Sequence, residues 1–242
     1  MTILDILFPR RCPVCDRPVP VKDGLICKEC REKLIYTKEP FCMRCGKPLQ
    51  GYDKSTGTAD ELQREFCYDC MHRFHLYDRG VCLYHYDSVR RTVYRFKYSG
   101  RKEYAVFLGQ EMAVHLGKQL LAWNPDALVP VPLHSVRLKK RGYNQAALLA
   151  RELGRRLEIP VAEKWLIRDK NTVPLKMMDG RKRQKSLKNA FKIVQNELKL
   201  KTIIIIDDIY TTGSTIDAIA ALCRENGVER VYFAALSVGS GM

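Results

Sequence analysis

The sequence of 242 residues lacks a long apolar run anywhere along its length. A helix that crosses a bilayer needs about 20 consecutive, mostly apolar residues, so we expect no membrane insertion. The chain also lacks a recognisable secretory signal, because the apolar segment at residues 1–9 is short and Asp5 interrupts it. Without a signal for an oxidising compartment, we expect a cytoplasmic protein with reduced thiols. We expect residues 1–9 to pack on the region that follows.

Large apolar side chains are scarce in residues 10–75, so a hydrophobic core alone would not hold this region together. Eight of the ten cysteines lie there as four Cys-x-x-Cys pairs. This spacing lets two thiolates bind one tetrahedral Zn²⁺, and eight thiolates fill two closed, structural sites. Disulfides are the alternative, and the missing secretory signal disfavours them. The predicted ligands are Cys12, Cys15, Cys27, Cys30, Cys42, Cys45, Cys67 and Cys70.

The order of the pairs favours one zinc site from the first four cysteines and a second from the last four, with a crossed pairing as the alternative. Eleven residues separate the two pairs of the first site and 21 those of the second, and both lengths suit a zinc ribbon. Eight cysteines leave no vacancy for His72 or His75, which we expect on the surface. Cys82 and Cys223 are predicted to be small core residues.

Neither residues 1–78 nor residues 79–242 carry an excess of acidic residues. Residues 1–78 hold 13 Lys/Arg and 12 Asp/Glu, whereas residues 79–242 hold 29 and 15. Nearly all of the net charge of +15 therefore lies in the second part. A basic domain of this kind favours a polyanionic partner, with a soluble basic surface as the alternative.

Near the C-terminal end, a predicted strand, an acid pair and a loop follow one another. The four isoleucines 203–206 predict a strand buried on both faces of a parallel sheet. Asp207 and Asp208 follow at its carboxyl end, where open α/β sheets bind ligands. The next residues run into a predicted helix and can offer amides and hydroxyls to a phosphate: Tyr210, Thr211, Thr212, Gly213, Ser214 and Thr215.

This segment resembles the phosphoribosyl-pyrophosphate (PRPP) signature of type I phosphoribosyltransferases. The resemblance implies that the acid pair holds the ribose hydroxyls, that the loop holds the 5′-phosphate, and that Mg²⁺ accompanies PRPP. An ordinary strand–turn–helix with solvated acids is the alternative. Elsewhere the second part alternates between predicted strands at 81–86, 127–132, 165–167 and 231–236 and predicted helices at 103–123, 146–157 and 216–225, which indicates an α/β fold.

Residues 89–98 interleave cations with aromatic side chains. Such a surface suits single-stranded DNA, whose bases can stack on the rings. An amphipathic helix with Val89, Val93 and Phe96 facing inward is the alternative, and one helix can satisfy both. The predicted DNA contacts here are Arg90, Arg91, Tyr94, Arg95, Lys97 and Tyr98.

Two further basic segments follow. The turn expected after residue 132 carries Arg137, Lys139, Lys140 and Arg141, and the resemblance assigns them to the pyrophosphate, with a solvated basic turn as the alternative. Residues 168–192 suit the mobile loop that covers PRPP in these enzymes, or a basic loop that contacts nucleic acid. The cations predicted to contact DNA from this second segment are Arg181, Lys182, Arg183, Lys185 and Lys188.

Four motifs together resemble the ComF family: residues 7–15, 96–100, 130–132 with 141–145, and 207–215. The resemblance covers nearly the whole chain. It implies a double zinc ribbon at residues 1–78 and a type I phosphoribosyltransferase-like α/β domain, with a Rossmann-like parallel sheet, at residues 79–242. In one departure, Leu175 follows Thr172-Val173-Pro174, where the family's loop usually carries Gln.

The family resemblance implies a competence protein for natural transformation that binds PRPP and single-stranded DNA during cytoplasmic handling of incoming DNA. A helicase or translocase of the competence machinery is an expected partner. An active phosphoribosyltransferase and a PRPP-sensing interaction module are the two alternatives. No aromatic box for a nucleobase is visible, and only residues 237–242 follow the last predicted strand, which leaves little chain for an acceptor hood. The sequence therefore favours the binding role.

Overall fold

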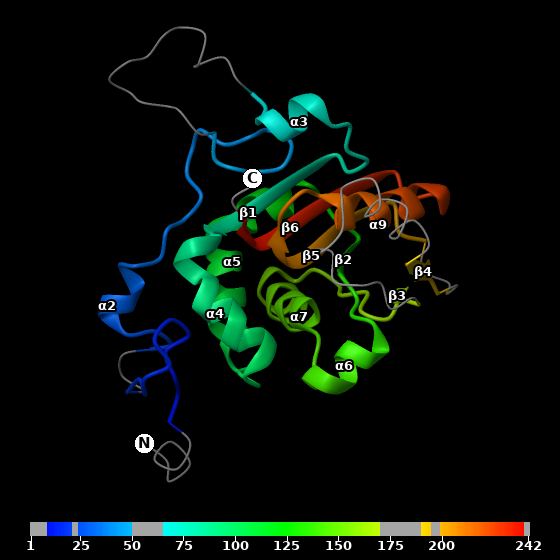
Figure 1. The fold of residues 1–242 in the computed structure, drawn as a ribbon. Helices are drawn as coiled ribbons and strands as arrows, with labels where there is room; N and C mark the ends of the chain where they lie inside the picture. Colours follow the sequence, from blue (N-terminus) through cyan, green and yellow to red (C-terminus); the bar gives the residue numbers. More distant parts are fainter. Residues whose placement is uncertain (1–8, 21–23, 50–64, 170–189, 195–198, 240–242) are drawn as a thin grey trace, which may run out of the picture.

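The computed structural model describes residues 9–20, 24–49, 65–169, 190–194 and 199–239. Its centre is a four-stranded, fully parallel sheet with the order β1-β6-β5-β2 (Figure 1). The strands are β1 (Arg79–His85), β2 (Ala127–Pro130), β5 (Thr202–Tyr210) and β6 (Arg230–Val238). The predicted parallel α/β fold is confirmed, whereas the division into residues 1–78 and 79–242 stays a prediction.

Strand β5 is central because its apolar segment packs on both faces. Ile203, Ile204, Ile205 and Ile206 are all completely buried. The odd-numbered pair belongs to one core and the even-numbered pair to the other. This arrangement follows from the alternation of side chains along a strand, and it confirms the prediction of a doubly covered strand.

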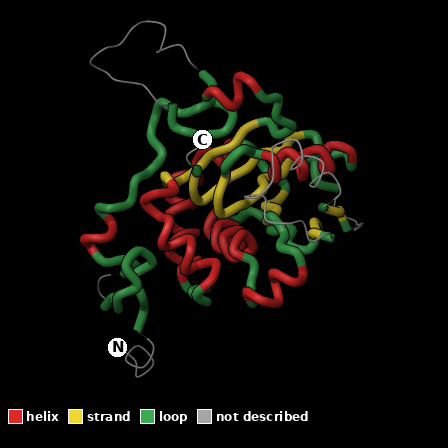
Figure 2. The backbone as a smooth tube through the Cα atoms, in the orientation of Figure 1, coloured by secondary structure: helices red, strands yellow, loops and turns green. Residues whose placement is uncertain are grey.

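Helices cover the two faces unequally (Figure 2). Helices α4 (Tyr86–Tyr98), α5 (Tyr104–Ala122) and α7 (Gln145–Leu157) contribute to one core. Helix α9 (Ser214–Glu225) packs in the other, together with a separate antiparallel pair formed by β3 (Leu166–Arg168) and β4 (Phe191–Ile193). The remaining described helices are α2 (Lys28–Arg31), α3 (Tyr68–His72) and α6 (Ser135–Arg141).

Helix α6 corrects the prediction of a turn at residues 134–145. His134 caps its N-terminus by accepting a hydrogen bond from the Val136 amide, and Gly142, at φ 82°, ends it. A left-handed residue at the end of a helix favours glycine, so both boundaries are locally encoded. Asn144 caps the following helix, because its side chain accepts a hydrogen bond from the Ala146 amide.

The first cysteine region, at the blue end of the chain in Figure 1, packs beside α4 and α5. The Asp16 carboxylate accepts hydrogen bonds from the Tyr104 hydroxyl (2.5 Å) and the Arg101 guanidinium (2.9 Å). Arg95 of α4 donates to the Val14 carbonyl (2.9 Å). Val89, Val93 and Phe96 of α4 are buried, which confirms the predicted amphipathic helix, and its polar face also contacts the cysteine region.

The second cysteine region packs on the opposite core, against β1. Cys42 and Cys45 are buried in that core, and the Gly80 amide donates to the Arg44 carbonyl (2.7 Å). Gly46 has φ +69°, and a Cβ there would lie 2.9 Å from the Gly80 carbonyl oxygen. Glycine is therefore required here by both the backbone conformation and the space.

The connection between the two cysteine regions covers the outer edge of β1. The Thr37 amide donates to the Leu83 carbonyl, and the His85 amide donates to the Ile35 carbonyl. The Tyr36 hydroxyl also reaches the buried Glu111 carboxylate of α5 (2.5 Å). An edge strand with free backbone groups invites pairing with other chains, and this segment occupies that edge.

In the part of the chain that the structure describes, no helix combines the length and the apolarity that crossing a membrane requires. The segment at residues 1–8, expected to pack on the cysteine region, lies outside the described residues.

We predict that Gly46→Ala destabilises the protein more than Gly24→Ala does. Both glycines have positive φ, +69° and +85°, but an added Cβ at Gly24 meets no atom within 4 Å. The two substitutions therefore share a backbone cost of about 1–3 kcal/mol, and the Gly46 variant adds a collision with β1. Denaturant unfolding of both variants measures the difference. Equal losses would show that the second cysteine region does not pack on β1 in solution.

Candidate functional site

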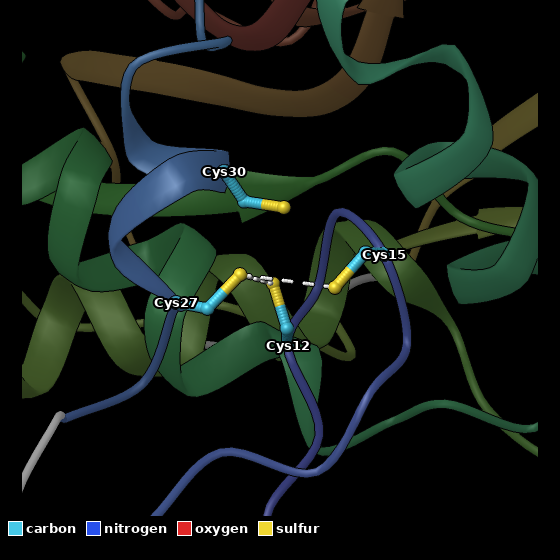
Figure 3. Close-up of side chains that lie close together, drawn as sticks. All are labelled: Cys12, Cys15, Cys27 and Cys30. Atoms are coloured by element: carbon cyan, nitrogen blue, oxygen red, sulfur yellow. Dashed lines mark hydrogen bonds between the residues drawn. The ribbon is translucent and has the colours of Figure 1, made fainter.

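The eight predicted zinc ligands gather into two clusters. Cys12, Cys15, Cys27 and Cys30 converge on one point (Figure 3), and the ligand atoms of each cluster lie within 4.8 Å of one another. The second cluster comprises Cys42, Cys45, Cys67 and Cys70. The predicted sequential pairing is therefore confirmed.

The sulfur geometry fits a tetrahedral zinc ion. With Zn–S bonds of about 2.3 Å, the sulfur atoms of a regular tetrahedron stand about 3.8 Å apart. The Cys15–Cys27, Cys12–Cys27 and Cys45–Cys67 sulfur pairs are 3.8, 3.6 and 3.6 Å apart. These distances are far longer than a disulfide bond of about 2.05 Å. Both clusters consist of four thiols, so each would hold a structural zinc with no open position.

Each cluster is built from one turn and one helix start. The Asp16 amide donates a hydrogen bond to the Cys12 carbonyl, and the Gly46 amide donates one to the Cys42 carbonyl. These two bonds close the turns. Cys27 and Cys67 stand directly before α2 and α3. The local sequence thus brings each pair into a chelating position, and the fold only has to join the pairs.

The second candidate site lies at the carboxyl end of β5. Asp207 and Asp208 are the sixth and seventh residues of that strand, which runs on to Tyr210. The Asp208 amide donates to the Asp207 carboxylate (2.8 Å). Burial, together with the neighbouring Asp208 carboxylate, raises the pKa of Asp207 to about 7, and the Lys97 ammonium partly opposes this rise.

Lys97 of α4 completes the acid pair. Its ammonium lies 2.9 Å from the Asp208 carboxylate, and both side chains are largely buried. Sequence reasoning assigned Lys97 to DNA, whereas the structure places it at the predicted ribose site. The placement depends on how α4 crosses the sheet, which no local pattern reveals.

Arg168 lies near the same strand end, and Arg137 lies near Arg168. Arg168 ends β3, and its pKa is lowered by burial and by the nearby Arg137 of α6, while Asp207 opposes that decrease. A guanidinium whose charge is disfavoured by burial and by a second cation indicates a position suited to an anion. Of the four cations predicted for the pyrophosphate, Arg137 is thus placed near Arg168. Lys139 and Lys140 lie on the exposed side of α6, and Arg141 packs over the Tyr98 ring.

The loop after β5 has the form expected of a phosphate cradle. It lines a pocket with Asp207 and leads directly into α9, whose N-cap is Gly213 at φ 77°. The Thr212 and Ser214 hydroxyls lie 3.0 Å apart, and the amides at a helix start have no partner within the helix. These groups point to an anion. The Tyr210 side chain is 3% exposed and packs inward, so only its backbone could reach a ligand.

His75 is a residue of this region that the sequence analysis placed wrongly. It was expected on the surface but is 3% exposed, and its Nδ1 lies 2.8 Å from the Asp217 carboxylate of α9. A histidine close to cysteines invited comparison with a zinc ligand, and no sequence signal linked it to a helix 142 residues away. His72 is exposed as expected.

The predicted DNA contacts on α4 divide into two groups. Arg90, Arg91, Tyr94 and Tyr98 are exposed, and the two tyrosine rings lie 5.2 Å apart. Arg95 and Lys97 instead make the intramolecular contacts already described. The half-buried Arg141 of α6 lies 5.1 Å from the Tyr98 ring centre and so adjoins the exposed stripe formed by Arg90, Arg91, Tyr94 and Tyr98. The cations Arg181, Lys182, Arg183, Lys185 and Lys188 lie outside the described residues.

We predict that Asp207→Asn raises the melting temperature at pH 8 and has less effect at pH 5.5. The pKa of this carboxyl is about 7 in the folded protein, against an ordinary value of 3.8. The folded state therefore binds the proton more tightly, and the cost of ionising Asp207 increases as the pH rises from about 4 to 7. Asparagine has no such cost. Thermal unfolding of both proteins across this range gives the difference, and a constant difference would contradict the raised pKa.

Comparisons with known proteins agree with this geometry. A family model described as "Double zinc ribbon domain" matches residues 3–71, and one described as "Phosphoribosyl transferase domain" matches residues 106–238. The chain is similar to "Competence protein F" of Haemophilus influenzae, with 32% identity over 213 residues, which cover 85% of this chain and 93% of that protein.

Two further relatives extend the similarity. "DNA utilization protein YhgH" of Escherichia coli K12 is 29% identical over 230 residues, covering 93% of this chain and 96% of that protein. "Competence protein ComFC" of Bacillus subtilis is 31% identical over 217 residues, covering 85% of this chain and 80% of that protein. With both domain types in the same order along the chain, the protein belongs to the ComF family.

Proposed function

We propose that this protein serves natural transformation by binding PRPP and single-stranded DNA while incoming DNA is handled in the cytoplasm. The observation that carries the proposal is the Lys97–Asp208 ion pair. It joins the acid pair, which suits ribose hydroxyls, to a helix whose outer face carries exposed tyrosines and arginines. The names of the competence and DNA utilization relatives support the same role.

The phosphoribosyl half of the proposal uses four groups. Asp207 and Asp208 would accept hydrogen bonds from the ribose hydroxyls, and the amides and hydroxyls at residues 211–215 would bind the 5′-phosphate. Arg137 and Arg168 would face the pyrophosphate. Mg²⁺ would accompany PRPP, because this hard cation prefers oxygen ligands and binds with substrate phosphates.

The DNA half uses the stripe that runs along α4 to Arg141. Tyr94 and Tyr98 are 61% and 65% exposed, so bases could reach their rings. Arg90 and Arg91 would neutralise backbone phosphates, and such contacts carry little sequence preference. A helicase or translocase would act on the same strand and is the proposed protein partner.

We predict that Asp207→Ala combined with Asp208→Ala weakens PRPP binding in the presence of Mg²⁺ at least tenfold, or about 1.4 kcal/mol. The double variant loses both carboxylate acceptors for the ribose. Isothermal titration measures the loss, and Asp87→Ala, which changes an exposed acid on α4, is the matched control. If the folded double variant binds PRPP as tightly as the parent, the assignment of Asp207 and Asp208 to the ribose is wrong.

We predict that Arg90→Ala with Arg91→Ala weakens binding to a single-stranded oligonucleotide and reduces its salt dependence. Two fewer phosphate contacts should lower the slope of log K against log salt by roughly 1.4. Tyr94→Ala with Tyr98→Ala should weaken binding without changing that slope, because stacking releases no counterions. Fluorescence anisotropy at several salt concentrations separates the two effects.

Lys118→Ala, an exposed cation on α5, is the control for the DNA measurement. Arg95 is left unchanged because its substitution would remove the hydrogen bond to the Val14 carbonyl and disturb the first cysteine region. If these α4 variants bind DNA like the parent, the stripe is not the contact surface. PRPP binding with no DNA affinity at any salt concentration would instead favour an enzyme or a PRPP sensor. Titrating PRPP with and without DNA tests whether the two ligands are coupled.

A further inference from the structure

The segment at residues 73–78, which joins the second cysteine region to β1, lies against the loop at residues 211–215. His75 in this segment is 3% exposed, and its Nδ1 donates to the Asp217 carboxylate over 2.8 Å. The same carboxylate accepts a hydrogen bond from the Leu76 amide (2.9 Å). Asp217 stands in the first turn of α9, so the segment holds the helix start at which the loop ends.

His75 also contacts the loop itself. Gly213 takes the left-handed conformation at φ +77°, and a Cβ there would lie 3.0 Å from Cε1 of the imidazole. The same Cβ would lie 2.9 Å from the Tyr210 hydroxyl. The loop glycine is therefore enclosed by a side chain from the ribbon connection and one from β5.

Tyr77 holds the other end of the loop. Its hydroxyl lies 2.7 Å from the Tyr210 hydroxyl, and both side chains are buried. Tyr210 is the last residue of β5, directly before the loop. The His75 ring stacks on the Tyr77 ring with a centroid distance of 4.8 Å. One short segment thus contacts both ends of the loop.

This segment is attached to the second zinc cluster. His75 follows Cys70 by five residues, and Asp69, between the last two ligands, pairs with Lys47 at 2.5 Å. The Lys47 ammonium lies 5.8 Å from the centre of the Tyr210 ring. Zinc at this cluster would fix Asp69 and Cys70, and with them the position of His75 and Tyr77.

We propose that the second zinc ribbon is part of the phosphate-binding apparatus, with His75 and Tyr77 as positioning residues for the loop at 211–215. The inference rests on the proposed function in that it takes the loop to bind the 5′-phosphate of PRPP. Neither residue needs to touch the ligand. Their contacts hold the loop amides in one arrangement before the phosphate arrives, which reduces the ordering cost of binding.

The test compares His75→Leu, which puts an apolar side chain of similar size in place of the donor, with His75→Asn, which retains a donor close to the position of Nδ1. The full-length, two-zinc protein is used throughout, and His72→Leu, an exposed histidine of the same segment, is the control. We expect His75→Leu to weaken binding of PRPP with Mg²⁺ about tenfold. We expect His75→Asn to recover most of the affinity and His72→Leu to change nothing.

Hydrogen exchange of the amides at residues 208–217 supplies a second readout that needs no ligand. We expect faster exchange there in His75→Leu, with the His75→Asn variant close to the parent. Unchanged affinity and exchange in a folded, two-zinc His75→Leu protein would overturn the inference, as would equal losses in His75→Asn. If the His75→Leu variant fails to fold, Tyr77→Phe is used in its place in both measurements, because this substitution removes only one hydroxyl.

The two proposals fail in different ways. If the parent protein binds no PRPP, the proposed function is wrong, and the exchange rates still decide whether His75 positions the loop. If the parent binds PRPP and none of the variants changes either readout, the ribbon inference alone is wrong.

Discussion

The burial of the isoleucine segment of β5 on both faces is the constraint on which the candidate site depends. Four isoleucines fill both cores, and the same strand then carries two carboxylates to the point where the apolar layers end. Burying a carboxylate costs free energy unless a cation accompanies it, and Lys97 supplies that cation from α4. The raised pKa of Asp207 shows that compensation is incomplete in the free protein. A polar ligand at this edge could supply further partners.

The two ribbons are parts of the fold rather than appendages to it. The first ribbon is joined to α4 and α5 through Asp16 and Val14, and the second supplies backbone partners to β1 through Arg44. Because few large apolar residues lie in this region, two zinc ions would provide most of its own stability. Metal binding would then also hold in place the ribbon surfaces that pack against the sheet and its helices.

Helix α4 has two structural roles and one proposed role, and each depends on different residues. Its apolar face fills a core, Arg95 and Lys97 hold a ribbon and an acid pair, and the remaining exposed cations and rings are free for a nucleic acid. Basic residues beside aromatics therefore do not all share one function. Successive side chains along a helix point about 100° apart, and only this direction separates a proposed DNA contact from an internal ion pair.

Local patterns in the sequence determined much of this protein. The spacing of four cysteine pairs, the isoleucine run and the inward positions Val89, Val93 and Phe96 each act within a few residues, so zinc pairing, the central strand and an amphipathic helix could be predicted. The family resemblance added the order of the domains. Tertiary structure alone decided that Lys97 joins Asp208 and that His75 joins Asp217, because these partners are far apart in the chain and meet only when the sheet, helices and ribbons pack together.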